Sequence, residues 1–236
     1  MPHSMSFANK ARAAAAAAIL ISLVLPVRAL AWQWSGNVIS SAGGRRKAVA
    51  LTFDDGPHPV KTPEILELLS DYGIHATFFV TGDNASRYPE IIQQEIDGGH
   101  EIGNHTYSHV FLKKVPFETA KSEICALDDL MLENFEYKPK LLRPPGGLYN
   151  DRICRYANDL GYEVVLWSID TKDWAHTPAD EITDTVINNV KNGDIILCHD
   201  FVGGASYTAA ALRTVIPKLL DMGFEFVTVS ELLGTE

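Results

Sequence analysis

The feature that most constrains this chain is a repeated alternation of short apolar runs with longer amphipathic segments. Apolar runs with the length of buried strands lie at residues 48–53, 76–80, 101–104, 140–142, 163–167, 194–198 and 225–229. Segments with helical periodicity lie between them, at residues 63–72, 89–98, 116–134, 151–160, 179–190 and 209–222. Strands that alternate with helices in this way predict an α/β fold with a parallel sheet.

The number of these units favours one architecture. A chain of 236 residues is long enough for one well-buried domain. Seven or eight β/α units suit closure into a barrel better than an open sheet, although an open doubly wound sheet remains the alternative. In either architecture we expect the reactive groups at the C-terminal ends of the strands.

The N-terminal residues have the layout of a secretory signal. Lys10 and Arg12 precede an apolar run at residues 13–26, and a small-residue pattern ends at Ala31. The run is shorter than the roughly 20 residues that a membrane-spanning helix needs. We therefore expect cleavage after Ala31, and an uncleaved anchor is the alternative because Arg28 interrupts the usual pattern.

The expected organisation is a signal segment at residues 1–31, a tether at 32–47 and a folded domain at 48–236. The signal segment holds three basic residues and no acidic one, so its removal takes the formal charge from −10 to −13. An acidic domain is a poor partner for nucleic acid or anionic lipid. We expect an exported monomer (secreted, periplasmic or cell-wall associated) with no nucleic-acid partner, and with no stable membrane partner unless the signal segment stays uncleaved.

Polar residues gather where the predicted strands end. They are Asp54 and Asp55 after the first strand, His105 after the third, Arg143 after the fourth, Asp170 and Asp173 after the fifth, and His199 and Asp200 after the sixth. Each has an ordinary explanation when taken alone, since two aspartates before Gly-Pro often form only a turn. Their occurrence at one end of one sheet favours a common site.

Two of these regions supply candidate metal ligands. His105 and His109 are four residues apart, so they would share a face if the segment were one helical turn. Imidazole with a carboxylate suits zinc or a similar first-row ion, and Asp55 is the natural third ligand. Three protein ligands leave room for water, which is typical of a catalytic metal site.

Two further residues are candidates for proton transfer. Asp54 lies beyond the strand end, where it could act as a general base. His199 could carry a proton to an amine leaving group near neutral pH. Arg143 would keep Asp54 ionised, and Asp173 would hydrogen-bond to His199 and favour its protonated form.

Five segments of the chain resemble, in order, the five motifs of the polysaccharide deacetylase family, which is carbohydrate esterase family 4 and contains the NodB homology domain. They are Thr52-Phe53-Asp54-Asp55-Gly56-Pro57, His105-Thr106-Tyr107-Ser108-His109, Arg143-Pro144-Pro145-Gly146-Gly147, Asp170-Thr171-Lys172-Asp173-Trp174 and Leu197-Cys198-His199-Asp200. The resemblance spans about residues 47 to 233. The first two motifs together are highly specific, whereas the last two alone would be weak.

The resemblance implies a distorted (β/α)7-type barrel and a metal-dependent hydrolase. Such an enzyme removes N-acetyl groups from N-acetylglucosamine-containing polysaccharide, peptidoglycan or chitin-like oligomers, and releases acetate. The alternative is an O-acetyl xylan esterase that uses the same metal site, and a non-enzymatic wall-binding protein is a third, less favoured class. The implied cofactor is a divalent metal, zinc or else cobalt or another first-row ion.

The resemblance also implies a role for each matching residue. Asp54 resembles the catalytic base, and Arg143 resembles the residue that orients this base. His199 resembles the catalytic acid, and Asp173 resembles the residue that tunes this acid. The residues that resemble the metal ligands are Asp55, His105 and His109, and those that resemble the walls around the acetyl methyl group are Trp174 and Leu197.

Gly146 is a departure from the family pattern, because many members carry Tyr at this position. The backbone N–H of that residue helps to stabilise the oxyanion, and glycine still supplies it. The missing side chain leaves the shape of the adjacent sugar subsite open.

Overall fold

The computed structural model describes residues 38–44 and 46–234, all within one compact unit, Trp34–Glu236. The predicted signal segment at residues 1–31 lies outside the described residues. The strands are β1 (Ala48–Asp54), β2 (Thr77–Val80), β3 (Glu101–Asn104), β4 (Leu141–Leu142), β5 (Glu163–Val164), β6 (Ile169–Asp170), β7 (Ile195–His199) and β8 (Glu225–Phe226). The helices are α1 (Lys61–Asp71), α2 (Gly82–Arg87), α3 (Pro89–Asp97), α4 (Phe117–Phe135), α5 (Asp151–Asp159), α6 (Ala179–Asn189), α7 (Thr208–Asp221) and α8 (Val229–Leu233), with 3₁₀ turns η1 (Leu112–Lys114), η2 (Pro145–Gly147) and η3 (Asp173–Ala175).

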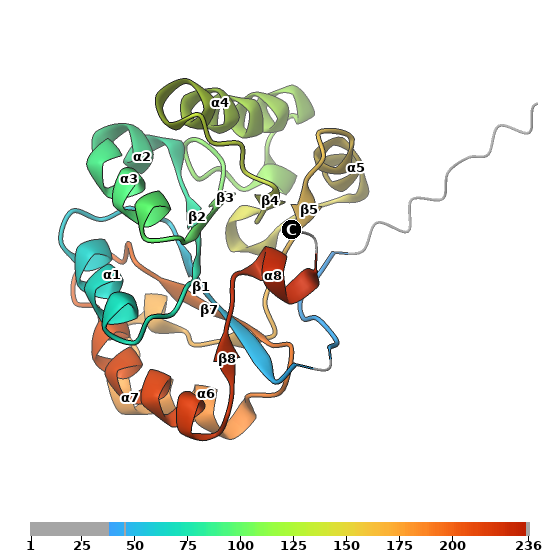
Figure 1. The fold of residues 1–236 in the computed structure, drawn as a ribbon. Helices are drawn as coiled ribbons and strands as arrows, with labels where there is room; N and C mark the ends of the chain where they lie inside the picture. The colour runs from blue at the N-terminus through green and yellow to red at the C-terminus, as the bar shows by residue number, and fades with distance from the viewer. Residues whose placement is uncertain (1–37, 45, 235–236) are drawn as a thin grey trace, which may run out of the picture. The chain divides into compact units, whose positions relative to one another are not determined.

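The strands form a parallel sheet that curves as a distorted barrel, as predicted. Their order is β5-β4-β3-β2-β1-β7-β6, and β8 pairs with β1 (Figure 1). β1 is therefore central, with β2 on one side and β7 on the other. Because the strands are parallel, the loops that follow them lie at the same end of the sheet.

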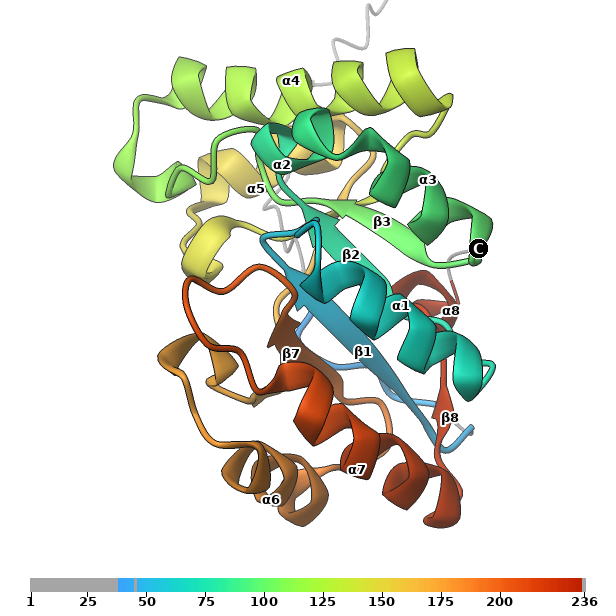
Figure 2. The ribbon, with the colours of Figure 1, turned by 90° about the vertical axis from the view of Figure 1, so that its left-hand side faces the viewer.

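Alternation along β1 separates the hydrophobic core from the barrel interior. Val49, Leu51 and Phe53 pack in the large core cluster with side chains of α1 and α7, two of the helices that lie over the sheet in Figure 2. Ala50 belongs to a different cluster on the opposite face. Since side chains alternate with a period of two, Asp54 shares the inward face with Ala50.

The structure corrects several predicted element boundaries. The predicted strand at 163–167 is shorter, since β5 ends at Val164, and the separate strand β6 was not predicted. The predicted strand at 225–229 stops at Phe226, and α8 starts at Val229. The short helices α2 and α8 were not predicted.

Part of the predicted tether contacts the folded unit. Ile39 forms a parallel bridge to Val165, and Ser41 forms an antiparallel bridge to Asp194. Among the described residues, no helix is long and apolar enough to cross a membrane.

Candidate active site

Asp54 and Arg143 form a buried ion pair inside the barrel. Arg143 Nη1 donates to Asp54 Oδ1 at 2.6 Å and to Thr52 Oγ1 at 2.8 Å, and Nη2 donates to the Leu166 carbonyl at 2.9 Å. Both side chains are buried, and the guanidinium lies 4.0 Å from the centre of the Phe79 ring. These contacts hold the Asp54 carboxylate in one orientation and leave Oδ2 for another partner.

Asp55 lies at the mouth of the barrel, the end where the strands finish, and it faces this mouth because of an unusual backbone conformation. If β1 continued, its side chain would point away from that of Asp54. Its φ is instead 77°, in the left-handed region. The turn is fixed on both sides, since the Asp55 N–H donates to the Phe79 carbonyl at 3.2 Å and the Asn84 amide donates to the Asp55 carbonyl at 2.7 Å.

His105 and His109 approach Asp55 from the loop after β3. His105 is buried, and its Nδ1 lies 2.7 Å from the Arg143 carbonyl. An imidazole that donates through Nδ1 keeps the Nε2 lone pair free for a metal. The segment is not a helical turn, so the condition under which both histidines would share one helix face is not met. It is an irregular loop in which Thr106 and His109 have left-handed φ values of 70° and 56°.

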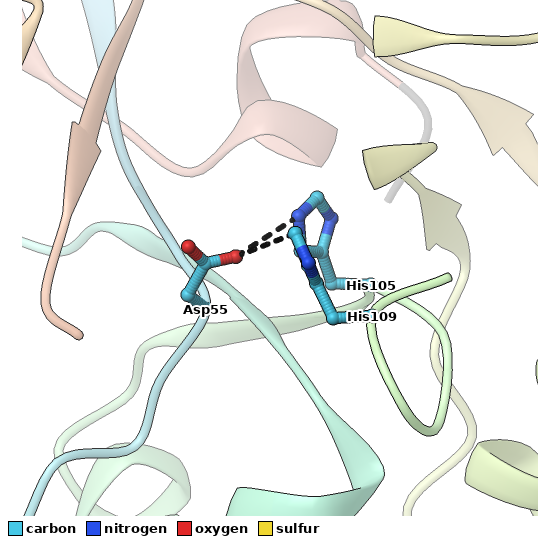
Figure 3. Close-up of side chains that lie close together, drawn as sticks. All are labelled: Asp55, His105 and His109. Atoms are coloured by element: carbon cyan, nitrogen blue, oxygen red, sulfur yellow. Dashed lines mark ion pairs between the residues drawn. The ribbon is translucent and has the colours of Figure 1, made fainter. Parts of the chain in front are cut away.

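The three side chains converge in a way that could hold a metal ion (Figure 3). Asp55 Oδ1 lies 3.3 Å from His105 Nε2 and 3.1 Å from His109 Nε2, and the three ligand atoms lie within 4.8 Å of one another. Oδ1 is buried yet accepts no hydrogen bond of good geometry from the described residues. A carboxylate and two imidazoles form a donor set that fits zinc and similar ions.

Electrostatics at this group favour an ionised carboxylate. Burial raises the pKa of Asp55, but the two adjacent imidazoles outweigh burial and hold that pKa well below its usual range. A carboxylate must be deprotonated to bind a metal. Asp55 is therefore ready for this role over the whole physiological pH range.

His199 and Asp173 form a second polar cluster. β7 ends at His199, and the strand register pairs His199 with Asp54 of β1. His199 Nδ1 lies 2.8 Å from Asp173 Oδ1, and the His199 N–H donates to Asp173 Oδ2 at 2.7 Å. The Thr208 hydroxyl also donates to Oδ2 at 2.7 Å.

The Asp173 carboxylate determines the charge of His199. Burial lowers the pKa of His199, but the hydrogen bond to Asp173 and the charges of Asp173, Asp54 and Asp55 outweigh burial and raise it to about 9. His199 therefore carries a proton at neutral pH. Because Nδ1 faces Asp173, Nε2 is the atom left to donate.

The remaining predicted site residues occupy three settings. Gly146 lies in η2 with a left-handed φ of 60°, and a Cβ added there would be only 2.9 Å from the Phe111 ring. Trp174 is 53% exposed, and its backbone N–H donates to Asp173 Oδ1 at 2.9 Å. Leu197 is buried in β7. Trp174 and Leu197 thus adjoin the His199 cluster, whereas Gly146 lies against Phe111.

Residues that support the site from helices were missed by the sequence analysis. Asn84 on α2 bonds to the Asp55 carbonyl, Thr208 on α7 bonds to Asp173, and Glu123 on α4 bonds to Ser108. A threonine at a helix start is ordinarily interpreted as a cap. Hydrophobic periodicity identifies core positions and gives no sign of such polar partners.

The fold and the site together define a class of protein. A parallel α/β barrel that carries a candidate metal group, a buried carboxylate and a charged histidine at its C-terminal strand ends has the parts of a metal-assisted hydrolase. Comparison with known proteins identifies the family.

A sequence model described as "Polysaccharide deacetylase" matches residues 41–165. A peptidoglycan-N-acetylglucosamine deacetylase of Bacillus cereus is 42% identical over 202 residues, which cover 84% of this chain and 94% of that protein. A chitooligosaccharide deacetylase of Sinorhizobium fredii is 34% identical over 199 residues, which cover 80% of this chain and 93% of that protein. The solved structure of the Bc1960 peptidoglycan N-acetylglucosamine deacetylase superposes with a TM-score of 0.82 at 37% identity, over 84% of this chain and 94% of that chain.

The chain belongs to the polysaccharide deacetylase family. This confirms the family and the fold class that the motifs predicted. The enzyme class is also confirmed, since the relatives are deacetylases.

Proposed function

We propose that this chain removes acetyl groups from N-acetylglucosamine units of a polysaccharide, peptidoglycan or a chitin-like oligomer, and releases acetate. The observation that carries the proposal is the register that sets Asp54 beside His199, with the Asp55-His105-His109 group at the same mouth. Relatives named as deacetylases of peptidoglycan and of chitooligosaccharides support it.

Asp55, His105 and His109 are the proposed metal ligands. We propose zinc as the ion, and cobalt or another first-row ion suits the same donors. When bound, such an ion polarises a carbonyl oxygen and lowers the pKa of a water molecule.

Asp54 is the proposed general base. The Arg143 guanidinium donates to Asp54 Oδ1, so Oδ2 remains to accept a proton from that water molecule. Oδ2 lies 3.7 Å from His105 Nε2 and therefore faces the metal group. Hydrogen bonds to the Thr52 hydroxyl and the Leu166 carbonyl fix the Arg143 guanidinium, which in turn positions Asp54.

His199 is the proposed acid. Its Nε2 donates a proton to the amine nitrogen as the C–N bond breaks, while Asp173 fixes the ring and its charge. The Gly146 N–H is the proposed partner of the oxyanion. Trp174 and Leu197 are the proposed apolar walls around the acetyl methyl group.

We also propose that the protein acts outside the cytoplasm as a monomer, with residues 1–31 removed after Ala31. The B. cereus relative is named for peptidoglycan, which is a polysaccharide of the cell wall. A substrate of this kind supports a location outside the cytoplasm.

Acetate release from three polymers tests the function. Purified zinc-loaded protein is incubated with peptidoglycan, chitooligosaccharides and acetylxylan, and we expect acetate from at least one of the first two. Release from acetylxylan alone would replace the proposed activity by O-acetyl esterase activity. Release from none of the three would favour a wall-binding protein.

Replacement of Asp54 tests the proposed base. We expect Asp54→Asn to lower kcat by about 10²–10⁴-fold, because the amide cannot accept the proton. The zinc content, measured by mass spectrometry, should stay at the wild-type level since Asp54 is not a proposed ligand. Full activity of this variant would show that another residue is the base.

A further inference from the structure

A pocket of about 260 Å³ opens beside the candidate metal group. Asp55 and His109 form one side of it, and Asp83, Arg87 and Phe201 form other parts of its wall. Because two proposed metal ligands line the pocket, a group bound there lies next to the reacting group. Ligand pockets are commonly roughly 300–1,000 Å³, so this one suits a single small ring rather than a long segment.

Two charged side chains of the pocket are not engaged elsewhere. Asn84 and Ser108, which also line it, already bond to the Asp55 carbonyl and to α4. Across the part of the chain that the structure describes, neither the Asp83 carboxylate nor the Arg87 guanidinium forms a hydrogen bond or an ion pair with protein. Both are on α2 and four residues apart, so they lie on the same side of that helix.

Phe201 supplies a fixed aromatic wall. Its ring meets the His58 ring edge-on, with the ring centroids 5.0 Å apart. The loop that follows is tied to α1, because the Lys61 amine donates to the carbonyls of Val202 and Gly204. Contacts within the protein therefore preform this wall.

We propose that this pocket is a subsite for a neutral pyranose ring next to the sugar that is deacetylated. The Asp83 carboxylate accepts hydrogen bonds from hydroxyl groups, and the Arg87 guanidinium donates to hydroxyl oxygens. The pair adds no net charge, which suits a neutral sugar rather than an anion. The Phe201 ring offers an apolar surface for the C–H face of the ring. This inference rests on the proposed function and specifies how the polymer is held.

The test uses Arg87→Gln, Asp83→Asn and Phe201→Leu in the zinc-loaded chain. N-acetylchitooligosaccharides from monomer to pentamer give KM and kcat, and calorimetry gives Kd for the same oligosaccharides. Hydrolysis of para-nitrophenyl acetate reports on the reacting centre, because this ester has no second sugar. Arg155→Gln is the matched control, since Arg155 is an exposed arginine on α5 outside the pocket.

We expect KM and Kd for the trimer and longer oligomers to rise about tenfold in Arg87→Gln, the size of one lost hydrogen bond to a charged group. Asp83→Asn and Phe201→Leu should raise them in the same direction. The kcat/KM for para-nitrophenyl acetate, and every parameter of Arg155→Gln, should stay within about twofold of wild type. Melting temperatures identify any variant that is poorly folded.

Unchanged KM and Kd for the trimer in all three variants would overturn the subsite. An equal loss on para-nitrophenyl acetate would also overturn it, because the residues would then act on the reacting centre. The proposed function fails separately, if wild-type protein releases no acetate from any N-acetylated sugar. In that case the ratio of oligosaccharide Kd between Arg87→Gln and wild type still decides the subsite.

Discussion

His199 owes its charge to its neighbours. Burial lowers its pKa, and Asp173 is the largest opposing influence, so the pKa is raised to about 9. An acid must hold its proton before it donates. Activity that depends on His199 is therefore present below this pKa and is lost as the pH rises through it.

Replacement of Asp173 by Asn should move this loss of activity to lower pH. The substitution keeps the size of the side chain and removes the charge, so the His199 pKa falls and the alkaline limb of kcat/KM shifts down by about one unit or more. A pH–rate profile measures the shift. Asp170→Asn is the control, because the Asp170 carboxylate bonds to the Lys172 N–H rather than to His199. An alkaline limb that does not move in Asp173→Asn would exclude His199 as the group that titrates.

The sequence predicted which side chains meet at the mouth but not how they do so. Asp55, Thr106 and His109 have left-handed φ values of 77°, 70° and 56°. This region costs residues other than glycine about 1–3 kcal/mol and is concentrated at functional sites. Neither polarity nor spacing reveals such a conformation in advance, and His105 and His109 meet in a loop rather than on one face of a helical turn.

At the scale of elements, the loop with His105 and His109 is clamped between two helices. From α2, the N–H groups of Gly82 and Asp83 donate to the carbonyls of Thr106 and Tyr107 at 3.1 and 2.9 Å. From α4, the Glu123 carboxylate accepts from the Ser108 N–H at 2.7 Å and from its hydroxyl at 2.8 Å. Ser108 immediately precedes His109, whose backbone is strained, so the clamp holds this imidazole in place.

Removal of the α4 side of the clamp should weaken metal binding. Partners that orient metal ligands are typically worth about 10–100-fold in affinity, so we expect Glu123→Ala to raise the zinc Kd by about tenfold. Competition with a chromophoric chelator measures Kd directly. Glu118→Ala is the control, since Glu118 is exposed on the same helix and pairs with Lys121 rather than with Ser108. Equal zinc affinity in Glu123→Ala and wild type would mean that His109 holds its position without Ser108.

Long elements could be predicted from periodicity, whereas short ones could not. The structure keeps every long helix within two residues of its predicted bounds, including α7, which contains Pro217. α2 has six residues and starts at a glycine, so it has too few turns to show a periodic face. α8 did carry a readable signal, because Thr228 and Glu231 form a capping box.

At the scale of the whole molecule, parallel pairing assembles the site. β1 contributes Asp54 and Asp55, β3 leads into His105, β4 into Arg143, and β7 ends at His199. These strands are distant in sequence but adjacent or nearly adjacent in the sheet. The meeting of these side chains at one end of the sheet could be predicted from the alternation of strands and helices, because it requires only that all strands point the same way.

The metal group should therefore couple the stability of the molecule to zinc. A ligand that binds only the folded chain stabilises it by about 2.7 kcal/mol when its free concentration is roughly 100 times Kd. For a domain of this size, that corresponds to a rise in Tm of roughly 5–10 °C. Dialysis against a chelator should lower Tm by this amount, and added zinc should restore it, as calorimetry can measure.

Asp55→Ala separates binding at the proposed site from binding elsewhere. The Tm of Asp55→Ala should be insensitive to zinc, because the variant lacks the carboxylate of the metal group. Asp159→Ala is the control. It replaces an exposed carboxylate on α5, so its Tm should respond to zinc like that of the wild type. Zinc that also binds histidines and cysteines of the unfolded chain would reduce the shift in all three proteins equally. The difference between Asp55→Ala and Asp159→Ala thus isolates the folded site, and an equal zinc response in both would place the stabilising metal away from Asp55.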